Sequence, residues 1–326
     1  MKAVAELLRI FLRAGGGFLS GERVARELGF SRVYVHKLME TLRREGFVFH
    51  AVRNRGYRLD EEPDCFHPGL FSALFAEAPI PFFRTIRPLG STGSTNAVAE
   101  AELAAAAEAP LLIIATEQTA GRGRRGRRWH SPPDRNLYLS AGLRPALAPS
   151  RLQTITLFLG LRLCHFLRDQ FALPVLVKWP NDLLVHDRKL AGMLTEARVD
   201  AEQTRDLVFG FGLNGNLAAD ELPEELQPIA TSLQSATGQS VSLSRLAHQV
   251  AVVIGEAMED FFAGGTGGEL VKDWPAVDAL RGREVTAGDQ TGTVLGISPS
   301  GSLRLRRPDG SLALLHSGEV SVRPAH

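Results

Sequence analysis

The sequence has few cysteines, no long apolar run and no apolar leader at its start. Its 326 residues include two cysteines, Cys65 and Cys164, and no C-x-x-C pair. This spacing argues against a disulfide scaffold and a cysteine-ligated zinc site, and it is typical of a reducing compartment. The longest apolar candidate, residues 154–167, is interrupted by Arg162 and is too short to span a membrane. The first residues mix apolar and charged types, unlike a signal peptide. We therefore expect a cytoplasmic protein without a membrane partner.

What the chain does have is enough apolar material for a core, because 44% of its residues are hydrophobic and 22% are charged. Global disorder is therefore excluded, and the length predicts two or three domains. The net charge of +1 hides an asymmetry: residues 1–60 contain 12 basic and 6 acidic side chains, whereas the remainder contains 25 and 30. Such asymmetry favours a nucleic-acid-binding module joined to a near-neutral domain, with a solvated basic face as the alternative.

The N-terminal segment is patterned as three short helices and a hairpin. Apolar residues at helical spacing predict the first helix, and Ser20 and Ser31 can cap two more, over residues 21–28 and 32–45. Two alternating segments flank Arg53-Asn54-Arg55 and predict a β-hairpin with a basic tip. The pattern resembles the winged helix-turn-helix of bacterial DNA-binding regulators.

The second half of this segment is basic enough to contact DNA. Residues 31–58 contain seven basic and two acidic side chains, a concentration suited to phosphate contacts. Side chains that open the third helix can face base edges, and the wing tip can reach the backbone or the minor groove. The candidates are Arg32, Tyr34, Val35 and His36 on the helix, and Arg53 and Arg55 on the wing. We predict a DNA-binding domain over residues 1–62, with a winged helix used only for protein contacts as the alternative.

Beyond residue 62 the pattern predicts a linker, an α+β domain and a small β domain. Residues 63–81 contain several prolines next to an acidic cluster, which predicts a linker with a short helix over residues 70–77. Strands and helices with short hairpin links over residues 82–272 predict a mixed or antiparallel sheet. Short strands separated by Gly and Asp turns in residues 273–326 predict a small antiparallel barrel.

The loop G-R-G-R-R-G-R-R-W, residues 121–129, concentrates positive charge. Five of the seven residues from 122 to 128 are arginines. The spacing matches G-x-G-x-x-G, but a strand follows it where a dinucleotide-binding loop needs a helix. Guanidinium groups on a flexible backbone can clamp a polyphosphate or a nucleotidyl group. An arginine-rich loop that binds nucleic acid is the alternative.

Two further segments carry polar residues inside strand-like sequence. Lys178-Trp179-Pro180-Asn181-Asp182 and the later Lys189 combine two lysines, an amide and a carboxylate, which suit phosphate binding, metal support and charge neutralisation at phosphorus. Each residue alone is more often a solvated turn residue. Gly210, Gly212, Asn214 and Asn216 end a strand where the backbone can approach a ligand, with a simple bulge as the alternative.

Five motifs, in this order, resemble those of the biotin–protein ligases. They are S-T-G-S-T-N (91–96), T-E-Q-T-A-G-R-G-R-R-G-R-R-W-H-S-P (116–132), K-W-P-N-D-L (178–183), R-K-L-A-G-M-L-T-E (188–196) and G-F-G-L-N-G-N (210–216). With its winged helix the chain resembles the bifunctional members that also repress the biotin operon. The resemblance implies an α+β fold with an N-terminal winged helix-turn-helix, a central mixed-sheet α+β ligase domain and a small C-terminal SH3-like β-barrel, which assists ATP and carrier-protein binding. A passive structural cap is the alternative for that last domain.

The resemblance also implies a reaction. ATP would activate the biotin carboxylate to biotinoyl-5′-AMP, and a lysine of the biotin carboxyl carrier protein of acetyl-CoA carboxylase would then attack the mixed anhydride. Biotinoyl-AMP would act as corepressor and promote a homodimer that aligns two winged helices on operator DNA. Two alternatives remain: a ligand-sensing regulator without ligase activity, and a lipoate–protein ligase relative. Lys189 and the arginine loop argue against the first, and the G-R-G-R-R-G and K-W-P-N-D strings against the second.

Site residues follow from the same resemblance, residue by residue. Biotin would be bound by Ser94, Thr95, Asn96, Gln118, Arg122, Gly123, Arg124, Lys189 and Gly192. ATP and the adenylate would be bound by Gly121, Arg125, Trp129, Lys178, Asn181, Asp182, Asn214 and Asn216. Lys189, Arg124 and Lys178 would be catalytic, and Asp182 would support Mg²⁺. One departure from the family pattern is His130, which follows Trp129 where an aromatic residue is common.

Overall fold

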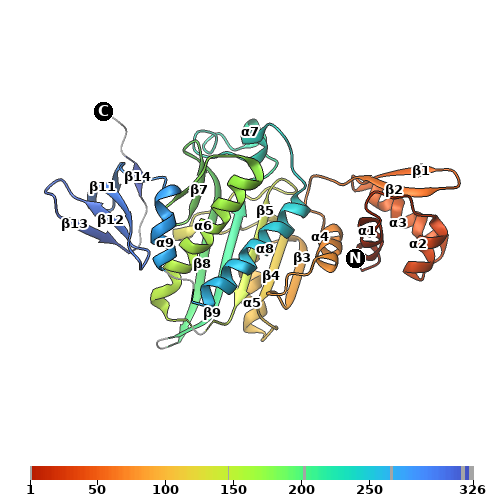
Figure 1. The fold of residues 1–326 in the computed structure, drawn as a ribbon, viewed down its shortest axis with the longest axis horizontal. Helices are drawn as coiled ribbons and strands as arrows, with labels where there is room; N and C mark the ends of the chain where they lie inside the picture. The colour runs from red at the N-terminus through yellow and green to blue at the C-terminus, as the bar shows by residue number, and fades with distance from the viewer. Residues whose placement is uncertain (1, 146, 201–202, 265–266, 317–319, 323–326) are drawn as a thin grey trace.

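The chain forms three parts arranged in a row (Figure 1). The structure is a computed structural model, and it describes residues 2–145, 147–200, 203–264, 267–316 and 320–322. A winged-helix part lies at one end, an α+β part in the middle, and a small antiparallel sheet at the other end. Among the described residues no helix is long and apolar enough to cross a membrane.

The winged-helix part begins with three helices and ends in a hairpin, as the sequence predicts. The serine caps form: Ser20 Oγ accepts a hydrogen bond from Arg23 N at 3.1 Å, and Ser31 Oγ accepts one from Tyr34 N at 3.2 Å. The two hairpin strands pair antiparallel. The elements are α1 (Lys2–Arg13), α2 (Gly21–Leu28), α3 (Arg32–Arg44), β1 (Val48–Val52) and β2 (Gly56–Glu61).

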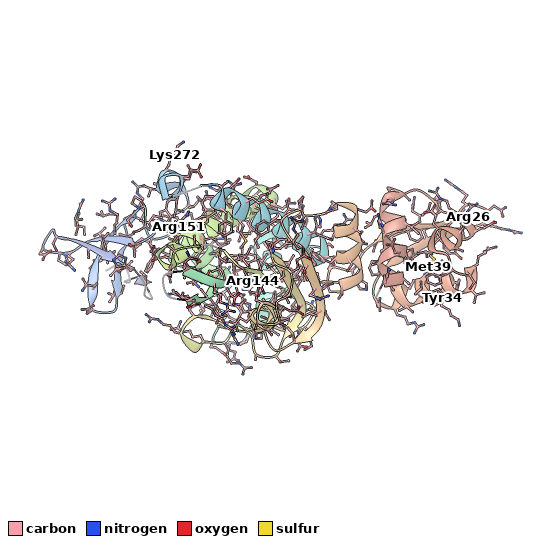
Figure 2. The ribbon with its side chains drawn as sticks, turned by 90° about the horizontal axis from the view of Figure 1, so that it is seen from below. Arg26, Tyr34, Met39, Arg144, Arg151 and Lys272 are labelled. Atoms are coloured by element: carbon pink, nitrogen blue, oxygen red, sulfur yellow. The ribbon has the colours of Figure 1, made fainter. Side chains whose placement is uncertain are left out.

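The prediction that Val35 faces base edges is wrong. Its side chain is 2% exposed and packs in the winged-helix core with Met39 and Leu42, because the three positions form one apolar stripe along α3. The opposite face of the helix is left to other side chains, among them Tyr34, which is exposed. Figure 2 shows Tyr34 and Met39 in this end part of the molecule.

The predicted linker is a packed connection. Its helix, α4 (Pro68–Glu77), starts two residues before the predicted bound, at a site where the His67 side chain accepts a hydrogen bond from Leu70 N. Leu70 belongs to the winged-helix core, whereas Phe71 belongs to the central core. Glu77 forms an ion pair with Arg9, at 2.6 Å. One helix therefore contacts both of the parts that it joins.

A seven-stranded sheet forms the middle part, with strand order β3-β4-β5-β9-β8-β7-β6. β3 pairs parallel with β4, and the other neighbours pair antiparallel, so the predicted mixed sheet is confirmed. The strands are β3 (Thr85–Thr92), β4 (Leu111–Gln118), β5 (Leu137–Leu143), β6 (Val175–Lys178), β7 (Asp182–Val185), β8 (Arg188–Asp200) and β9 (Gln203–Leu213).

Helices cover the two faces of this sheet unequally. α6 (Leu152–Phe171) and α8 (Leu243–Phe262) cover one face (Figure 1). Alternate residues of β4 divide between the faces: Leu112 and Ile114 join the main core, while Leu111 and Ile113 pack with α5 (Thr95–Ala104). Because α5 covers only part of the second face, the strands beyond it are open to a ligand.

The C-terminal part is an antiparallel sheet of order β13-β12-β11-β10-β14. Within the described residues it is an open sheet whose edges are β13 and β14, so an antiparallel β domain is confirmed but not its closure into a barrel. Its strands are β10 (Glu284–Ala287), β11 (Gln290–Ile297), β12 (Leu303–Arg306), β13 (Leu312–Leu315) and β14 (Ser321–Val322). Two short helices, α7 (Leu233–Thr237) and α9 (Gly267–Asp273), and the strand β14 are not predicted from the sequence.

We expect Leu70→Ala to destabilise the winged-helix part by about 2–4 kcal/mol, because it leaves a cavity where α4 enters that core. Chemical denaturation of the full chain, followed by circular dichroism, measures the loss. The matched control is Glu77→Gln, which removes the solvent-accessible ion pairs of Glu77 with Arg9 and Arg13 and should have a much smaller effect. Equal effects of the two substitutions would show that α4 is a surface linker.

Candidate functional site

The candidate site lies on the open face of the sheet, where β8 and β9 run side by side with few side chains. Gly192 and Gly212 are paired across the two strands. A methyl group at Gly212 would lie 2.7 Å from the Trp129 ring, and one at Gly210 would overlap the side-chain oxygen of Asn96. The glycines therefore let Trp129 and Asn96 lie directly against the strands.

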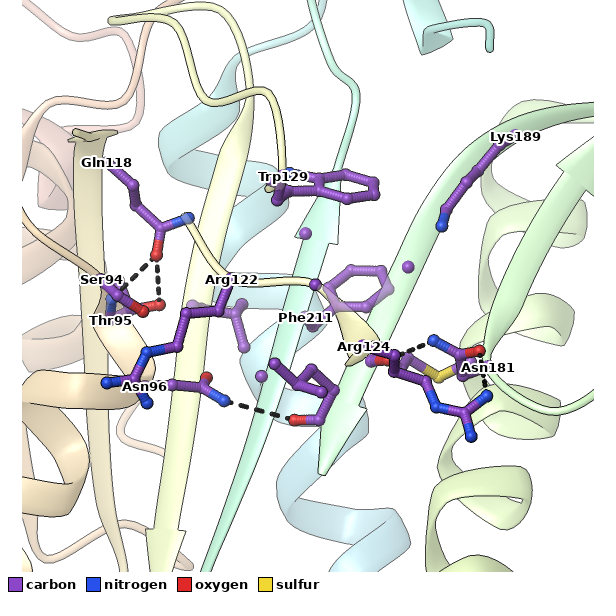
Figure 3. Close-up of a pocket in the computed structure, with 17 residues that line it drawn as sticks. Ser94, Thr95, Asn96, Gln118, Arg122, Arg124, Trp129, Asn181, Lys189 and Phe211 are labelled. Carbon is purple, nitrogen blue, oxygen red and sulfur yellow. Dashed lines mark hydrogen bonds between the residues drawn. The ribbon is translucent and has the colours of Figure 1, made fainter. Parts of the chain in front are cut away.

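One cavity on this face collects every residue that the sequence assigns to biotin. Figure 3 shows side chains from α5, β4, the arginine loop and β8 converging on it. The predicted residues that line it are Ser94, Thr95, Asn96, Gln118, Arg122, Gly123, Arg124, Lys189 and Gly192, and Trp129 and Asn181 line it too. Sequence reasoning missed Leu139, Met193, Leu194 and Phe211, which lie on the strands below the cavity. Apolar residues in a strand look the same in the sequence whether they line a cavity or pack in the core, so these four could not be found by pattern.

Hydrogen bonds fix the polar end of the cavity. Gln118 Oε1 accepts hydrogen bonds from Thr95 N at 2.8 Å and from Thr95 Oγ1 at 3.0 Å. Gln118 Nε2 donates to Ser131 Oγ at 3.1 Å, so the amide is fixed at both ends. Ser94 is 4% exposed and precedes α5 without making a side-chain cap, which leaves its hydroxyl for a ligand. This end can recognise a small polar group by both donors and acceptors.

A carboxylate behind the cavity holds two of the predicted residues. Asn96 Nδ2 donates to Glu196 Oε2 at 2.7 Å, while Asn96 Oδ1 accepts from Ser140 Oγ at 2.6 Å. Arg122 lies between Glu196 and Glu100, at 3.4 and 3.2 Å. These ion pairs tie the arginine loop to α5 and β8. Glu196 ends the R-K-L-A-G-M-L-T-E motif, and an acidic residue inside a strand was the signal that could have found it.

The rest of the arginine loop lies over the other end of the cavity. Arg124 Nη1 donates to Asn181 Oδ1 at 3.3 Å, and Asn181 Nδ2 donates to Met193 O at 2.7 Å. Arg125 is exposed with a positive φ of 56°, a backbone conformation that is often found at functional turns. Gly121 does not line the cavity, because it is packed beneath Ser131. The loop thus supplies both ligand-facing cations and a tight anchor.

Lys189 stands where the cavity opens. Its ammonium lies 2.7 Å from Asp182 Oδ1 and 5.1 Å from the centre of the Trp129 ring, within cation–π range. The lysine is about one-third exposed and the aspartate about one-quarter, so neither is sealed from solvent. An anionic ligand can therefore compete with Asp182 for the ammonium group.

Trp129 and Lys189 also line a neighbouring groove of about 400 Å³. It contains Lys178, Asp182 and Asn214 as predicted, together with Arg127, Arg128 and an apolar wall at Leu222, Leu226, Ile229 and Ala230 that sequence reasoning missed. His130 lines the groove, and partial burial lowers the pKa of its imidazole. The groove has the mixed cationic and apolar lining that a nucleotide needs.

Asn214 and Asn216 differ in their surroundings. Asn214 lines the groove, and its Nδ2 donates to Thr231 O at 2.8 Å. Asn216 lines none of the cavities described here. Its Nδ2 donates to Val241 O at 2.8 Å, and its Oδ1 accepts from Val241 N at 2.9 Å. The Asn216 amide, which was predicted to bind the adenylate, thus forms hydrogen bonds with the backbone.

The C-terminal sheet is attached to the hairpin that carries Lys178. Trp179 Nε1 donates to Gly301 O at 2.9 Å, and the indole is 1% exposed. At the other end of the hairpin, Asp187 forms an ion pair with Arg283 at 2.7 Å. The Arg283 guanidinium lowers the pKa of Asp187, and Lys178 lowers it further. Both turns of the β6-β7-β8 hairpin are therefore held by the C-terminal part.

The predicted DNA-contacting residues other than Val35 lie on the surface of the winged-helix part. Arg32, Tyr34, His36, Arg53 and Arg55 are all exposed. The Arg55 guanidinium lies 4.5 Å above the Phe18 ring, which orients it at the wing tip.

Within the described residues, no group of three or more His, Cys, Asp or Glu side chains could hold a metal ion. Asp182 is the predicted metal support; it lines the cationic groove, as does Asp187. Mg²⁺ at phosphate sites commonly rests on one or two carboxylates, with phosphates and water completing its shell. The residues therefore fit a Mg²⁺ ion that arrives with a nucleotide.

Comparisons with known proteins agree with this geometry. Residues 90–214 match the biotin/lipoate A/B protein ligase family, residues 4–58 an HTH domain, and residues 281–323 the biotin protein ligase C-terminal domain. The chain is 33% identical to the bifunctional ligase/repressor BirA of Salmonella typhimurium, over 98% of each chain. It is 30% identical to the BirA of Bacillus spizizenii, over 97% of this chain and 98% of that one. The biotin protein ligase of Aquifex aeolicus, solved with biotin and ATP, matches 74% of this chain and 100% of its own, with 29% identity and a TM-score of 0.64.

We expect Gly212→Ala to displace the Trp129 ring, because the added methyl group would lie 2.7 Å from it. Trp179 and Trp274 are each 1% exposed, so Trp129 is the tryptophan that reports on the cavity. Its emission should shift to longer wavelength and become more accessible to acrylamide. Gly90→Ala is the control, since nothing lies within 4 Å of the added methyl. An unchanged emission spectrum in Gly212→Ala would contradict the packing of Trp129 on the glycine strip.

Proposed function

The chain belongs to the biotin/lipoate A/B protein ligase family, among the bifunctional ligase/repressors, and we propose the following roles for its residues in biotin ligation. The protein is an ATP-dependent biotin ligase with a repressor-type helix-turn-helix. The observation that carries the residue assignment is that one cavity contains all the residues expected to bind biotin and shares Trp129 and Lys189 with a cationic groove. Biotin in the cavity and ATP in the groove would meet at these two side chains.

The first step joins two anions, so charge neutralisation is its main requirement. An oxygen of the biotin carboxylate attacks the α-phosphorus of ATP, the bond to pyrophosphate breaks, and biotinoyl-AMP forms. Lys189 and Arg124 lie at the end of the cavity where the carboxylate must emerge, and Lys178 lies in the groove. These cations bring the anions together and stabilise negative charge that develops on the phosphate. Mg²⁺, when bound beside Asp182, would neutralise phosphate oxygens.

The second step needs protection of the mixed anhydride from water. The amine of a carrier-protein lysine attacks the carbonyl carbon, the carbon–oxygen bond to AMP breaks, and an amide forms. Arg122 and Arg124 anchor the loop over the cavity through Glu100, Glu196 and Asn181. A loop held in this way excludes water from the anhydride while it leaves the Lys189 end open.

The three-part organisation fits these steps. We assign residues 1–62 to DNA binding, 63–81 to the connection, 82–272 to catalysis and 273–326 to an SH3-like domain that supports ATP and carrier-protein binding. The contacts of Trp179 with Gly301 and of Asp187 with Arg283 support the last assignment. We further propose a cytoplasmic location, the biotin carboxyl carrier protein of acetyl-CoA carboxylase as acceptor, and a homodimer promoted by biotinoyl-AMP.

We expect Lys189→Ala to lower adenylate formation by roughly 100- to 1,000-fold, because it removes the cation nearest the reacting carboxylate. The assay supplies ATP and labelled biotin and measures how fast the label is transferred to a purified carrier-protein domain. Lys272→Ala, at an exposed lysine of α9, is the matched control and should behave as wild type. Full activity in Lys189→Ala would contradict the assigned role. Labelling by lipoic acid in place of biotin would move the protein to the lipoate branch of the family.

For repression, we expect the full chain to retard promoter DNA of biotin-synthesis genes in a gel shift at least tenfold more strongly with biotinoyl-AMP than without it. The ligand acts through a site distant from the winged helix, so it must favour a DNA-binding state or dimer. The double variant Arg53→Ala/Arg55→Ala should lose binding and keep biotin transfer. Absence of a shift with and without ligand would leave only the enzyme.

A further inference from the structure

The recognition helix α3 presents an exposed valine in its first turn. Val33 is 68% exposed, whereas Val35, Met39 and Leu42 form the buried stripe on the opposite side. Lys37, one helical turn further on, is exposed on the same side as Val33. Valine is a weaker helix former than alanine, so helix stability does not explain an exposed valine at this position.

Two exposed aromatic side chains lie close to Val33 in the sequence, at the same end of the helix. Phe30 is 45% exposed and Tyr34 is 40% exposed, and their rings are 4.7 Å apart. The Ser31 cap on Tyr34 N fixes the backbone between them, at 3.2 Å. Three large apolar side chains, Phe30, Val33 and Tyr34, are thus exposed within five residues at the capped start of α3.

The winged-helix part that carries this apolar island also carries exposed positive charge. Arg32, Lys37 and Arg44 of α3 are exposed, as are Arg53 and Arg55 at the wing tip. The first turn of a helix also presents N–H groups that favour an anion. A partner must therefore combine a polyanionic surface with small apolar groups recessed behind it. Duplex DNA has this chemistry, because the thymine C5-methyl group is the apolar group of the major groove.

We propose that Val33 recognises thymine methyl groups in the major groove, with the Phe30–Tyr34 pair exposed at the same end of the helix. The inference rests on the proposed DNA binding and adds the base that the apolar island selects. Phosphate contacts from the arginines would hold α3 in the groove without reading sequence, and Val33 would supply discrimination between thymine and cytosine.

The test starts with the full chain, loaded with biotin and ATP, and a randomised duplex library from which bound sites are selected. Each thymine of the selected site is then replaced by deoxyuridine, which removes only the methyl group. We expect one or two positions at which this replacement weakens binding roughly fourfold, the factor that one buried methyl group corresponds to. Val33→Ala should show the same loss on thymine DNA and no further loss on deoxyuridine DNA.

The controls separate this proposal from its premise. Val48→Ala changes another exposed valine of the same domain, 45% exposed on β1, and should keep the full thymine preference. The circular dichroism spectrum and thermal unfolding of Val33→Ala should equal those of wild type, which shows that the winged-helix part is folded, and biotin transfer should be unchanged as well. If no sequence is selected, DNA recognition itself fails. If a site is selected but deoxyuridine has no effect, or the same effect in Val33→Ala, the thymine assignment is wrong. A change in sedimentation of DNA-free Val33→Ala would instead make the island a protein-contact surface.

Discussion

The site depends on a strip of sheet that has no side chains. Because Gly192 and Gly212 are neighbours on β8 and β9, the Trp129 indole lies against the backbone of both strands and the arginine loop can follow it down. The same closeness brings the indole under Lys189, whose ammonium lies 5.1 Å from the ring centre. Larger residues on this strip would lift the loop off the sheet, and the cavity and the groove would no longer share a wall. The positions of the polar side chains at the site therefore depend on the small volume of the glycines beneath them.

Each cation at the cavity is paired with a protein group. An anionic ligand could displace some of these partners and leave others in place. Arg122 is held by the carboxylates of Glu100 and Glu196, Asn181 accepts a hydrogen bond from Arg124, and Lys189 is held by the single carboxylate of Asp182. Partial burial of an unpaired cation is costly, so these partners stabilise the cations before a ligand binds. The gradation has a functional reading. Arg122, with two carboxylates, anchors the loop, whereas Lys189, with one, lies where the cavity opens.

The sequence predicted the elements and the polar residues of the site better than its walls. The capped helices, the basic hairpin, the mixed sheet and the shared cavity of the motif residues follow from local patterns and from a specific family resemblance. The prediction for Val35 was wrong because an apolar residue at the start of a helix can lie either in the buried stripe or on the surface, and the sequence does not show which until its neighbours are known. Glu196 and Asn216 required the tertiary structure, since nothing local shows that one supports Arg122 and the other pairs with the backbone at Val241. Closure of the C-terminal sheet likewise depends on long-range pairing that turn spacing does not determine.

The K-W-P-N-D segment connects the cationic groove to the C-terminal part. Lys178 and Asp182 line the groove, but Trp179 between them is buried in the central core and donates its indole N–H to Gly301. The loop that contains Gly301 packs closely against Leu157 of α6. With Asp187 held by Arg283, both turns of the β6-β7-β8 hairpin are braced from the same side. Loss of that support would leave Lys178 and Lys189 on a hairpin at the edge of the sheet, free to shift relative to the cavity. A passive cap would not need contacts at both turns; these two contacts link the C-terminal part to the hairpin that carries Lys178.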